Sequence, residues 1–205
     1  MASVPIGSYL GKEDGIHVAI SSWTRVSDNA IPARGKIAGS YVNSALAKTD
    51  AVLAGFDEAL LLNEHGHVCE GSVENVFMVT GRRRRDAAGD RRRARGLHPR
   101  HRDAAPARGP RSHGGRARRS TAPELYLAEE VFLTGTGAEI SPVTRVDHRL
   151  LGDGRIGPVA SSVRTRYLET VCGRVLARRG WCRPVYAPAA AETATAVAQA
   201  PGVVA

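Results

Sequence analysis

The sequence lacks an apolar run that approaches the ~20 residues of a membrane-spanning helix. Its start, Met1-Ala-Ser-Val-Pro5, lacks the pattern of a signal peptide. Only three cysteines are present, Cys69, Cys172 and Cys182, an odd number without the spacing of metal ligands. We therefore expect free thiols, no bound metal, no membrane contact and a cytoplasmic location.

The net charge of +9 does not by itself indicate a nucleic-acid-binding protein, because one segment carries it. Residues 81–120 hold 15 arginines and three aspartates, and the rest of the chain is mildly acidic. This tract contains no lysine and no aromatic residue, and Leu97 is its only large aliphatic residue. Nucleic-acid-binding segments usually combine basic with aromatic side chains, so the composition argues against that partner.

Hydrophobic patterns on either side of this tract predict a mixture of strands and helices in one main domain. The expected strands are 16–23, 57–62, 67–70, 74–79, 131–135 and 143–147. The expected helices are 40–54, 124–130 and 158–176. In the first helix, Val42, Ala45, Leu46, Val52 and Leu53 have the spacing of an amphipathic face.

A single lysine, Lys36, lies between Gly35 and Gly39, where an extended segment is predicted to turn into a helix. Burial readily lowers the pKa of a lysine, which then serves as a Schiff-base nucleophile. The glycines let a flat ring approach the backbone, and the Tyr41 hydroxyl follows in the first helical turn. Taken alone, the pattern also fits a solvated surface lysine and a tyrosine that only packs on the helix.

Two further stretches are rich in polar groups at predicted strand ends. Glu70 precedes Gly71 at the edge of a predicted meander, and Thr134-Gly-Thr-Gly137 can present backbone N–H groups to an anion. The plain alternatives are an exposed strand-end carboxylate and a tight turn. No one motif decides between these readings.

The order and spacing of the three motifs together resemble the class IV (fold-type IV) pyridoxal-phosphate aminotransferases, most closely the branched-chain amino acid aminotransferases. The motifs are Lys36-x-x-Gly-x-Tyr41, Glu70-Gly-Ser-x-x-Asn-x-Phe77 and Phe132-x-Thr-Gly-Thr136. The resemblance covers 1–80 and 124–186. It implies an α+β fold, the large pseudo-barrel domain of D-amino acid aminotransferase-like enzymes, here incomplete.

The resemblance also implies roles for individual residues. Lys36 would form the Schiff base with pyridoxal 5′-phosphate and move the proton during catalysis. Glu70 would pair with the pyridine nitrogen and keep it protonated, and Tyr41 would bind the phenolic oxygen. The implied cofactor-binding set is Lys36, Tyr41, Glu70, Ser72, Asn75 and Thr136. Thr136 and Gly137 would also bind the substrate carboxylate.

The implied reaction is transamination of leucine, isoleucine or valine, with 2-oxoglutarate as amino acceptor, in a cytoplasmic homodimer. Enzymes of the same fold that remain alternatives are D-amino acid aminotransferase and aminodeoxychorismate lyase. The small N-terminal domain of the family is absent from this sequence, so substrate choice rests on overall likeness. The partners expected are small molecules, namely branched-chain amino acids and 2-oxo acids.

The arginine tract divides the chain into four expected parts. These are the first part of the large domain (1–81), an aberrant tract (82–123), the second part (124–186) and a disordered tail (187–205). Codons of the tract read from another base are compatible with family-like sequence, which favours a frame shift over a functional arm.

As written, the tract places Gly96-Leu-His-Pro99 where the family has its phosphate-binding turn. Pro99 has no N–H to donate, so we expect lower activity than the family has. The alternative from another class is an inactive remnant or a basic RNA-associating fragment.

Overall fold

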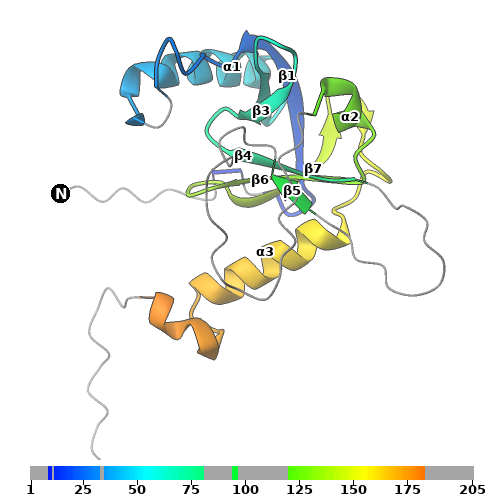
Figure 1. The fold of residues 1–205 in the computed structure, drawn as a ribbon. Helices are drawn as coiled ribbons and strands as arrows, with labels where there is room; N and C mark the ends of the chain where they lie inside the picture. Colours follow the sequence, from blue (N-terminus) through cyan, green and yellow to red (C-terminus); the bar gives the residue numbers. More distant parts are fainter. Residues whose placement is uncertain (1–8, 11, 33–34, 81–93, 97–119, 183–205) are drawn as a thin grey trace, which may run out of the picture. The chain divides into compact units, whose positions relative to one another are not determined.

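The computed structural model describes five stretches of the chain, residues 9–10, 12–32, 35–80, 94–96 and 120–182 (Figure 1). The chain divides into two compact units, residues 1–168 and 169–205. Within the described residues, no helix has the length and apolar character needed to cross a membrane.

The first unit is a mixed β-sheet that closes on itself (Figure 1). Its strands are β1 (Ile16–Thr24), β2 (Glu58–Leu62), β3 (Val68–Gly71), β4 (Asn75–Val79), β5 (Ala94–Gly96), β6 (Glu130–Gly135), β7 (Glu139–Val146) and β8 (Arg149–Leu150). Strand β1 pairs in parallel with β2 on one side and with β7 on the other, and the other neighbours are antiparallel. This double pairing closes the barrel, and the α+β architecture is confirmed.

The strands expected before the arginine tract are confirmed with small shifts at their ends, and the last expected strand differs more. Strand β7 begins at Glu139 rather than residue 143, because Glu139 pairs with Gly135 directly after the β6–β7 turn. The tract itself lies outside the described residues except at β5 and at residues 120–123, which are described with the helix that follows. Strand β5 lies within the tract. There Ala94–Gly96 pairs with Phe77–Val79 of β4. Backbone hydrogen bonds along an open strand edge need no particular side chains.

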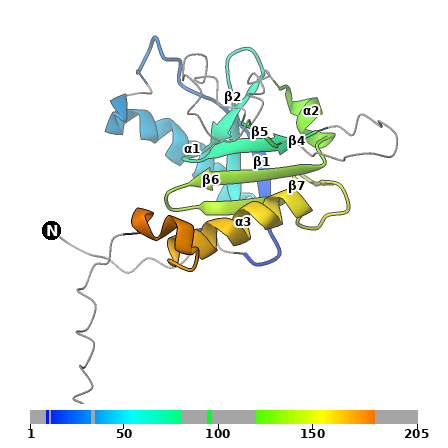
Figure 2. The ribbon, with the colours of Figure 1, turned by 60° about the horizontal axis from the view of Figure 1, so that its bottom comes forward.

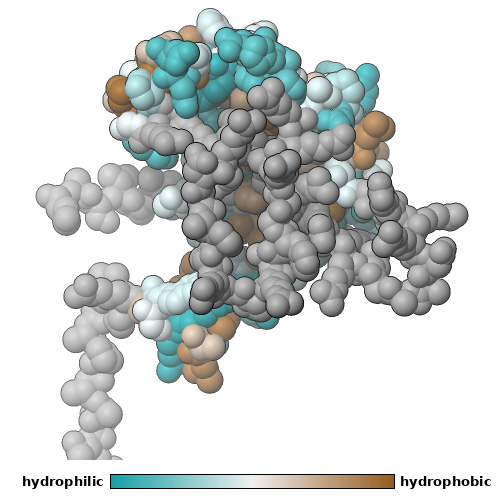
Figure 3. Space-filling model, viewed as in Figure 1, coloured by the Kyte–Doolittle hydropathy of each residue, from teal (hydrophilic) through white to brown (hydrophobic). Residues whose placement is uncertain are grey.

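Helix α1 (Tyr41–Leu53) follows the short 3₁₀ helix η2 (Ala38–Ser40) and packs on β1 and β2 (Figure 2). The predicted apolar face was wrong: Val42, Leu46, Val52 and Leu53 are all exposed, Leu53 at 81%. The helix instead buries Ser44, Ala47 and Ala51, whose small side chains allow close approach to Ala59 and Leu61 of β2. In Figure 3 the region of α1 is mainly hydrophilic, with isolated hydrophobic residues on its surface, which is normal for a protein surface.

Two more helices follow the tract. Helix α2 (Ala122–Tyr126) begins earlier than expected, because Thr121 starts it: its backbone N–H donates to the Glu124 carboxylate at 3.0 Å. Helix α3 (Pro158–Val171) runs along β6 and β7 (Figure 2) and ends before residue 176. In the second unit, Gly173 with φ +70° follows the end of α3, and the 3₁₀ helix η3 spans Leu176–Trp181.

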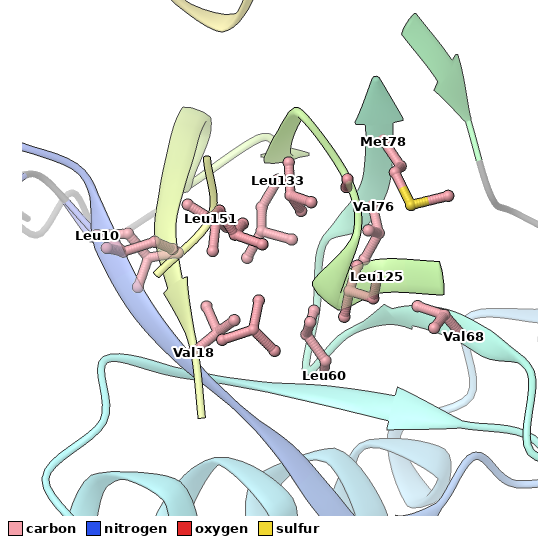
Figure 4. Close-up of a cluster of buried hydrophobic side chains, with 14 of the residues drawn as sticks. Leu10, Val18, Leu60, Val68, Val76, Met78, Leu125, Leu133 and Leu151 are labelled. Atoms are coloured by element: carbon pink, nitrogen blue, oxygen red, sulfur yellow. The ribbon is translucent and has the colours of Figure 1, made fainter. Parts of the chain in front are cut away.

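Aliphatic side chains from all around the barrel fill its interior. Figure 4 shows them pointing toward one another, with Val18, Leu60, Val76, Leu133 and Leu151 from separate segments. The three cysteines are free, as expected. Burial, with the nearby charge of Glu70, raises the pKa of the Cys69 thiol to about 11, so this thiol stays protonated at neutral pH.

A buried carboxylate joins the barrel to the start of α3. Glu130 of β6 is 5% exposed, and its oxygens accept the backbone N–H groups of Val159 (3.1 Å) and Ala160 (2.8 Å). A β-carbon at Gly157 would overlap this carboxylate. Glu130 thus caps a helix that is remote in sequence.

We expect Glu130→Ala to lower the free energy of unfolding by about 2 kcal/mol, because two helix N–H groups lose a charged acceptor. Urea unfolding of the full chain, followed by circular dichroism, measures this. Glu64→Ala is the matched control, since the Glu64 side chain is 70% exposed. Equal shifts in the two variants would contradict the capping role.

Candidate functional site

A cavity of about 130 Å³ lies where the end of β1, the loop before α1 and the β3–β4 turn meet. Its lining residues are Arg25, Lys36, Ser40, Tyr41, Ser44, Glu70, Ser72, Val73, Glu74 and Asn75. The structure therefore brings together five residues that the motifs singled out from separate parts of the sequence. They are Lys36, Tyr41, Glu70, Ser72 and Asn75.

Lys36 lies in the loop between the polar segment that follows β1 and helix α1. Its φ of +50° falls in the left-handed region, which is uncommon for a residue with a side chain. The expectation of a buried lysine is not met, because Lys36 is exposed in this structure. Its amine is therefore reachable from the cavity and from solvent alike.

The start of α1 supplies hydroxyl groups to the cavity. Tyr41 is the first residue of α1 and is 39% exposed, so its side chain is not packed in the hydrophobic core. Ser40 and Ser44 are buried, and the Ser40 hydroxyl donates to the Ile37 carbonyl at 2.8 Å. This bond ties the loop that carries Lys36 to the first turn of the helix.

Glu70 forms an ion pair with Arg25, whose Nε donates to Glu70 Oε1. Both side chains are mostly buried, with 16% of Arg25 and 20% of Glu70 exposed. The Arg25 Nη1 atom is buried and has no hydrogen-bond partner within the described residues. Sequence reasoning missed Arg25; its place directly after a predicted strand was the available clue.

The turn between β3 and β4 places three polar residues in the cavity wall. Glu70 pairs with Asn75 across the turn, and the Gly71 N–H donates to the Glu74 carbonyl at 2.7 Å. Ser72 is 4% exposed and Glu74 is 3% exposed, whereas Asn75 is exposed. Glu74 is a second residue that the motif analysis did not assign.

The pKa of Glu74 is raised to about 7, first by burial and then by the negative charge of Glu58. Glu58 of β2 is fully buried and accepts from the Lys48 ammonium at 2.7 Å and the Ala59 N–H at 2.7 Å. The cavity wall thus holds one carboxyl, Glu74, that is partly protonated at neutral pH, and the paired carboxylate of Glu58 lies behind this wall.

Thr136 and Gly137 are the two predicted site residues that the structure does not place among the cavity-lining residues. Both are exposed in the turn between β6 and β7. The Tyr9 side chain lies near this turn, with its Cβ 3.9 Å from where a Gly137 β-carbon would be. Burial and the charge of Glu58 raise the pKa of Tyr9. Tyr9 therefore joins this turn to the region of Glu58.

The predicted replacement of the phosphate-binding turn by Gly96-Leu-His-Pro99 cannot be placed, because residues 97–99 lie outside the described residues.

Comparison with known proteins identifies relatives of this chain. Residues 1–85 match the family model described as amino-transferase class IV. A probable branched-chain-amino-acid aminotransferase of Aquifex aeolicus is 41% identical over 180 residues, which are 88% of this chain and 58% of that protein. The chain thus spans little more than half the length of this relative.

Two solved structures extend the likeness to the fold. The branched-chain amino acid aminotransferase of Thermobaculum terrenum, in its holo-form with pyridoxal phosphate, is 30% identical. Its TM-score is 0.65, over 86% of this chain and 57% of that one. The branched-chain aminotransferase of Thermoproteus uzoniensis with norvaline has a TM-score of 0.71 at 33% identity, covering 90% and 60%. Sequence, fold and the grouping of Lys36, Tyr41 and Glu70 agree in their likeness to the class IV aminotransferases.

Proposed function

We propose that the chain carries the catalytic site of a pyridoxal 5′-phosphate-dependent aminotransferase that acts on leucine, isoleucine and valine, with 2-oxoglutarate as amino acceptor. The observation that carries the proposal is one cavity lined by Lys36, Tyr41, Glu70 and Arg25. The names of the relatives support the substrate class.

The groups in the cavity fit this cofactor. Lys36 offers a primary amine for an aldehyde, and Glu70 offers a carboxylate for a protonated ring nitrogen. Arg25 pairs with that carboxylate, and its buried Nη1 carries a further N–H donor. When bound, the cofactor supplies an electron-withdrawing ring that stabilises negative charge at the substrate Cα.

Each residue then has a limited task. The Lys36 amine would hold the cofactor covalently, and as a free amine it would carry the proton from the substrate Cα. Glu70 keeps the ring nitrogen protonated, and the Tyr41 hydroxyl binds the phenolic oxygen. Ser72 and Asn75 line the cavity from the β3–β4 turn, where they would contact the cofactor.

We also propose that Thr136 and Gly137 bind the anionic groups of cofactor and substrate. Their support is the exposed turn of small residues that presents a hydroxyl and backbone N–H groups. The same reading includes a homodimer that works in the cytoplasm, and three free cysteines are in keeping with that compartment.

Covalent mapping tests the proposal. The full chain is mixed with pyridoxal 5′-phosphate and reduced with borohydride, and peptide mass spectrometry locates the adduct. We expect the adduct on Lys36, because the other two lysines of the described part are paired: Lys12 with Asp57 (2.6 Å) and Lys48 with Glu58 (2.7 Å). An adduct on Lys12 or Lys48 in place of Lys36 would contradict the assignment. L-Leucine, but not D-alanine, should then release the unreduced cofactor from Lys36.

A further inference from the structure

The proposed reaction leaves one carboxyl in the cavity wall without a task. The Glu74 side chain is 3% exposed, and its Oε1 is buried without a hydrogen-bond partner within the described residues. Its Oε2 accepts a long bond from the Val73 N–H, at 3.2 Å, and the backbone N–H of Glu74 itself also donates to the carboxyl. A buried carboxylate with so few donors is costly, so this environment favours the uncharged acid.

The backbone makes room for this carboxyl group. A β-carbon at Gly71 would overlap the Glu74 carboxyl, and one at Gly135 would lie 3.5 Å from Glu74 Cγ. The side chain therefore fits between the β3–β4 turn and the end of β6 because residue 71 is a glycine, whereas the contact at Gly135 is an ordinary van der Waals distance. Its position in the wall is fixed by the fold rather than by hydrogen bonds.

The charged groups that act on Glu74 come from two other elements, β2 and α1. Burial acts first and the charge of Glu58 in β2 acts second, and together they raise the pKa of Glu74 to about 7. The Val73 N–H and the Lys48 ammonium of α1 oppose this rise. Tyr9 lies in the same cluster, since the charges of Glu58 and Glu74 both act on its hydroxyl.

The protonation state of Glu74 determines the net charge of the residues that line the cavity. The other charged lining residues are Arg25, Lys36 and Glu70, two positive and one negative. With uncharged Glu74 the described lining is net positive, and with ionised Glu74 it is neutral. In a partly enclosed site, one unit of charge changes the affinity for an anion substantially.

We propose that Glu74 is a positioning residue whose uncharged carboxyl keeps the cavity positive, so that the site binds anions in its protonated state and releases them when Glu74 ionises. The inference rests on the proposed function, in which the ligands are anionic. It assigns to Glu74 the control of the net charge of the cavity. Glu74 takes no part in making or breaking bonds.

The first arm of the test measures the protonation of Glu74 directly. Infrared difference spectra of the full chain between pH 5 and 9 should show the carbonyl band of a buried carboxylic acid that disappears with a midpoint near 7. The band should be missing in Glu74→Gln and present in Glu64→Gln, whose side chain in the wild type is 70% exposed. Glu58→Gln, which removes the neighbouring negative charge, should lower the midpoint.

The second arm measures anion binding. Pyridoxamine 5′-phosphate lacks the aldehyde that reacts with Lys36, and its affinity is measured by calorimetry at pH 6 and pH 8.5. We expect the wild-type affinity to fall about ten-fold more than that of Glu74→Gln over this range. The probe itself also titrates over this range, but its titration affects the wild type and the variant equally. The difference between the two proteins therefore reports Glu74 alone. Sulfate, ionised throughout this range, is run in parallel by thermal unfolding.

The outcomes separate the two proposals. A missing acid band at pH 6, or equal pH dependence in wild type and Glu74→Gln, would overturn the role of Glu74. If pyridoxamine phosphate does not bind while sulfate binding still depends on Glu74, the proposed function fails and the charge-setting role stands. If Glu74→Gln does not fold, the midpoint shift in Glu58→Gln and the wild-type pH profile decide.

Discussion

Lys36→Arg is expected to lower leucine-to-2-oxoglutarate turnover by at least about a thousand-fold, because positioned acid–base groups alone contribute roughly 10²–10⁴-fold. Arginine keeps the positive charge at the mouth of the cavity, but it neither attacks an aldehyde nor gives up a proton at neutral pH. The variant therefore separates the chemistry of the amine from its charge. Phosphate-containing probes should still bind to it.

Turnover is measured by the leucine-dependent formation of glutamate. Lys12→Arg is the control, because the Lys12 side chain is 63% exposed and pairs only with Asp57. Turnover in Lys36→Arg equal to that of Lys12→Arg would contradict the role of Lys36. The left-handed φ of +50° at Lys36 adds a second check: the circular dichroism of both variants should match the wild type, since arginine demands no more of the backbone than lysine does.

Glu70→Gln is expected to lower turnover by roughly ten- to a hundred-fold, the value of one hydrogen bond to a charged group. The amide keeps the size of the side chain but loses the negative charge that would hold a ring proton. It also leaves Arg25, which is 16% exposed, without its ionic partner. Both consequences act on the same wall of the cavity.

A double-mutant cycle separates these consequences. Arg25→Gln, Glu70→Gln and the double variant are compared by urea unfolding and by turnover. We expect the ion pair to give a coupling energy of about 1 kcal/mol or more in unfolding, because both side chains are mostly buried. In turnover, Glu70→Gln should remain defective in the Arg25→Gln background. Recovery of turnover in the double variant would show that the loss came from the orphaned arginine.

The strands on both sides of the arginine tract could be predicted because each is a short apolar run that ends in a turn. The packing face of α1 could not. Val42, Leu46 and Leu53 have the spacing of a buried stripe, yet the barrel accepts only the small residues Ala47 and Ala51 at that contact. Hydrophobic spacing shows which residues are apolar, but it does not show how closely two backbones approach.

The candidate site was predictable where a residue type has a distinctive chemistry next to a turn, as for Lys36 and Glu70. Arg25 and Glu74 were missed because their roles depend on partners brought near by folding. Arg25 meets Glu70 across the barrel wall, and Glu74 acquires its raised pKa from burial near Glu58. Neither relation is visible in a linear spacing.

The double pairing of β1 determines when the barrel completes itself during synthesis. Val18 pairs with Glu58 of β2, which leaves the ribosome early, but Ile16 pairs with Val143 of β7, which emerges much later. Until then one edge of β1 lacks its partner and can join a strand of another chain. Such late, long-range closure is slow. We therefore expect chaperones to bind the nascent chain until β7 has emerged from the ribosome.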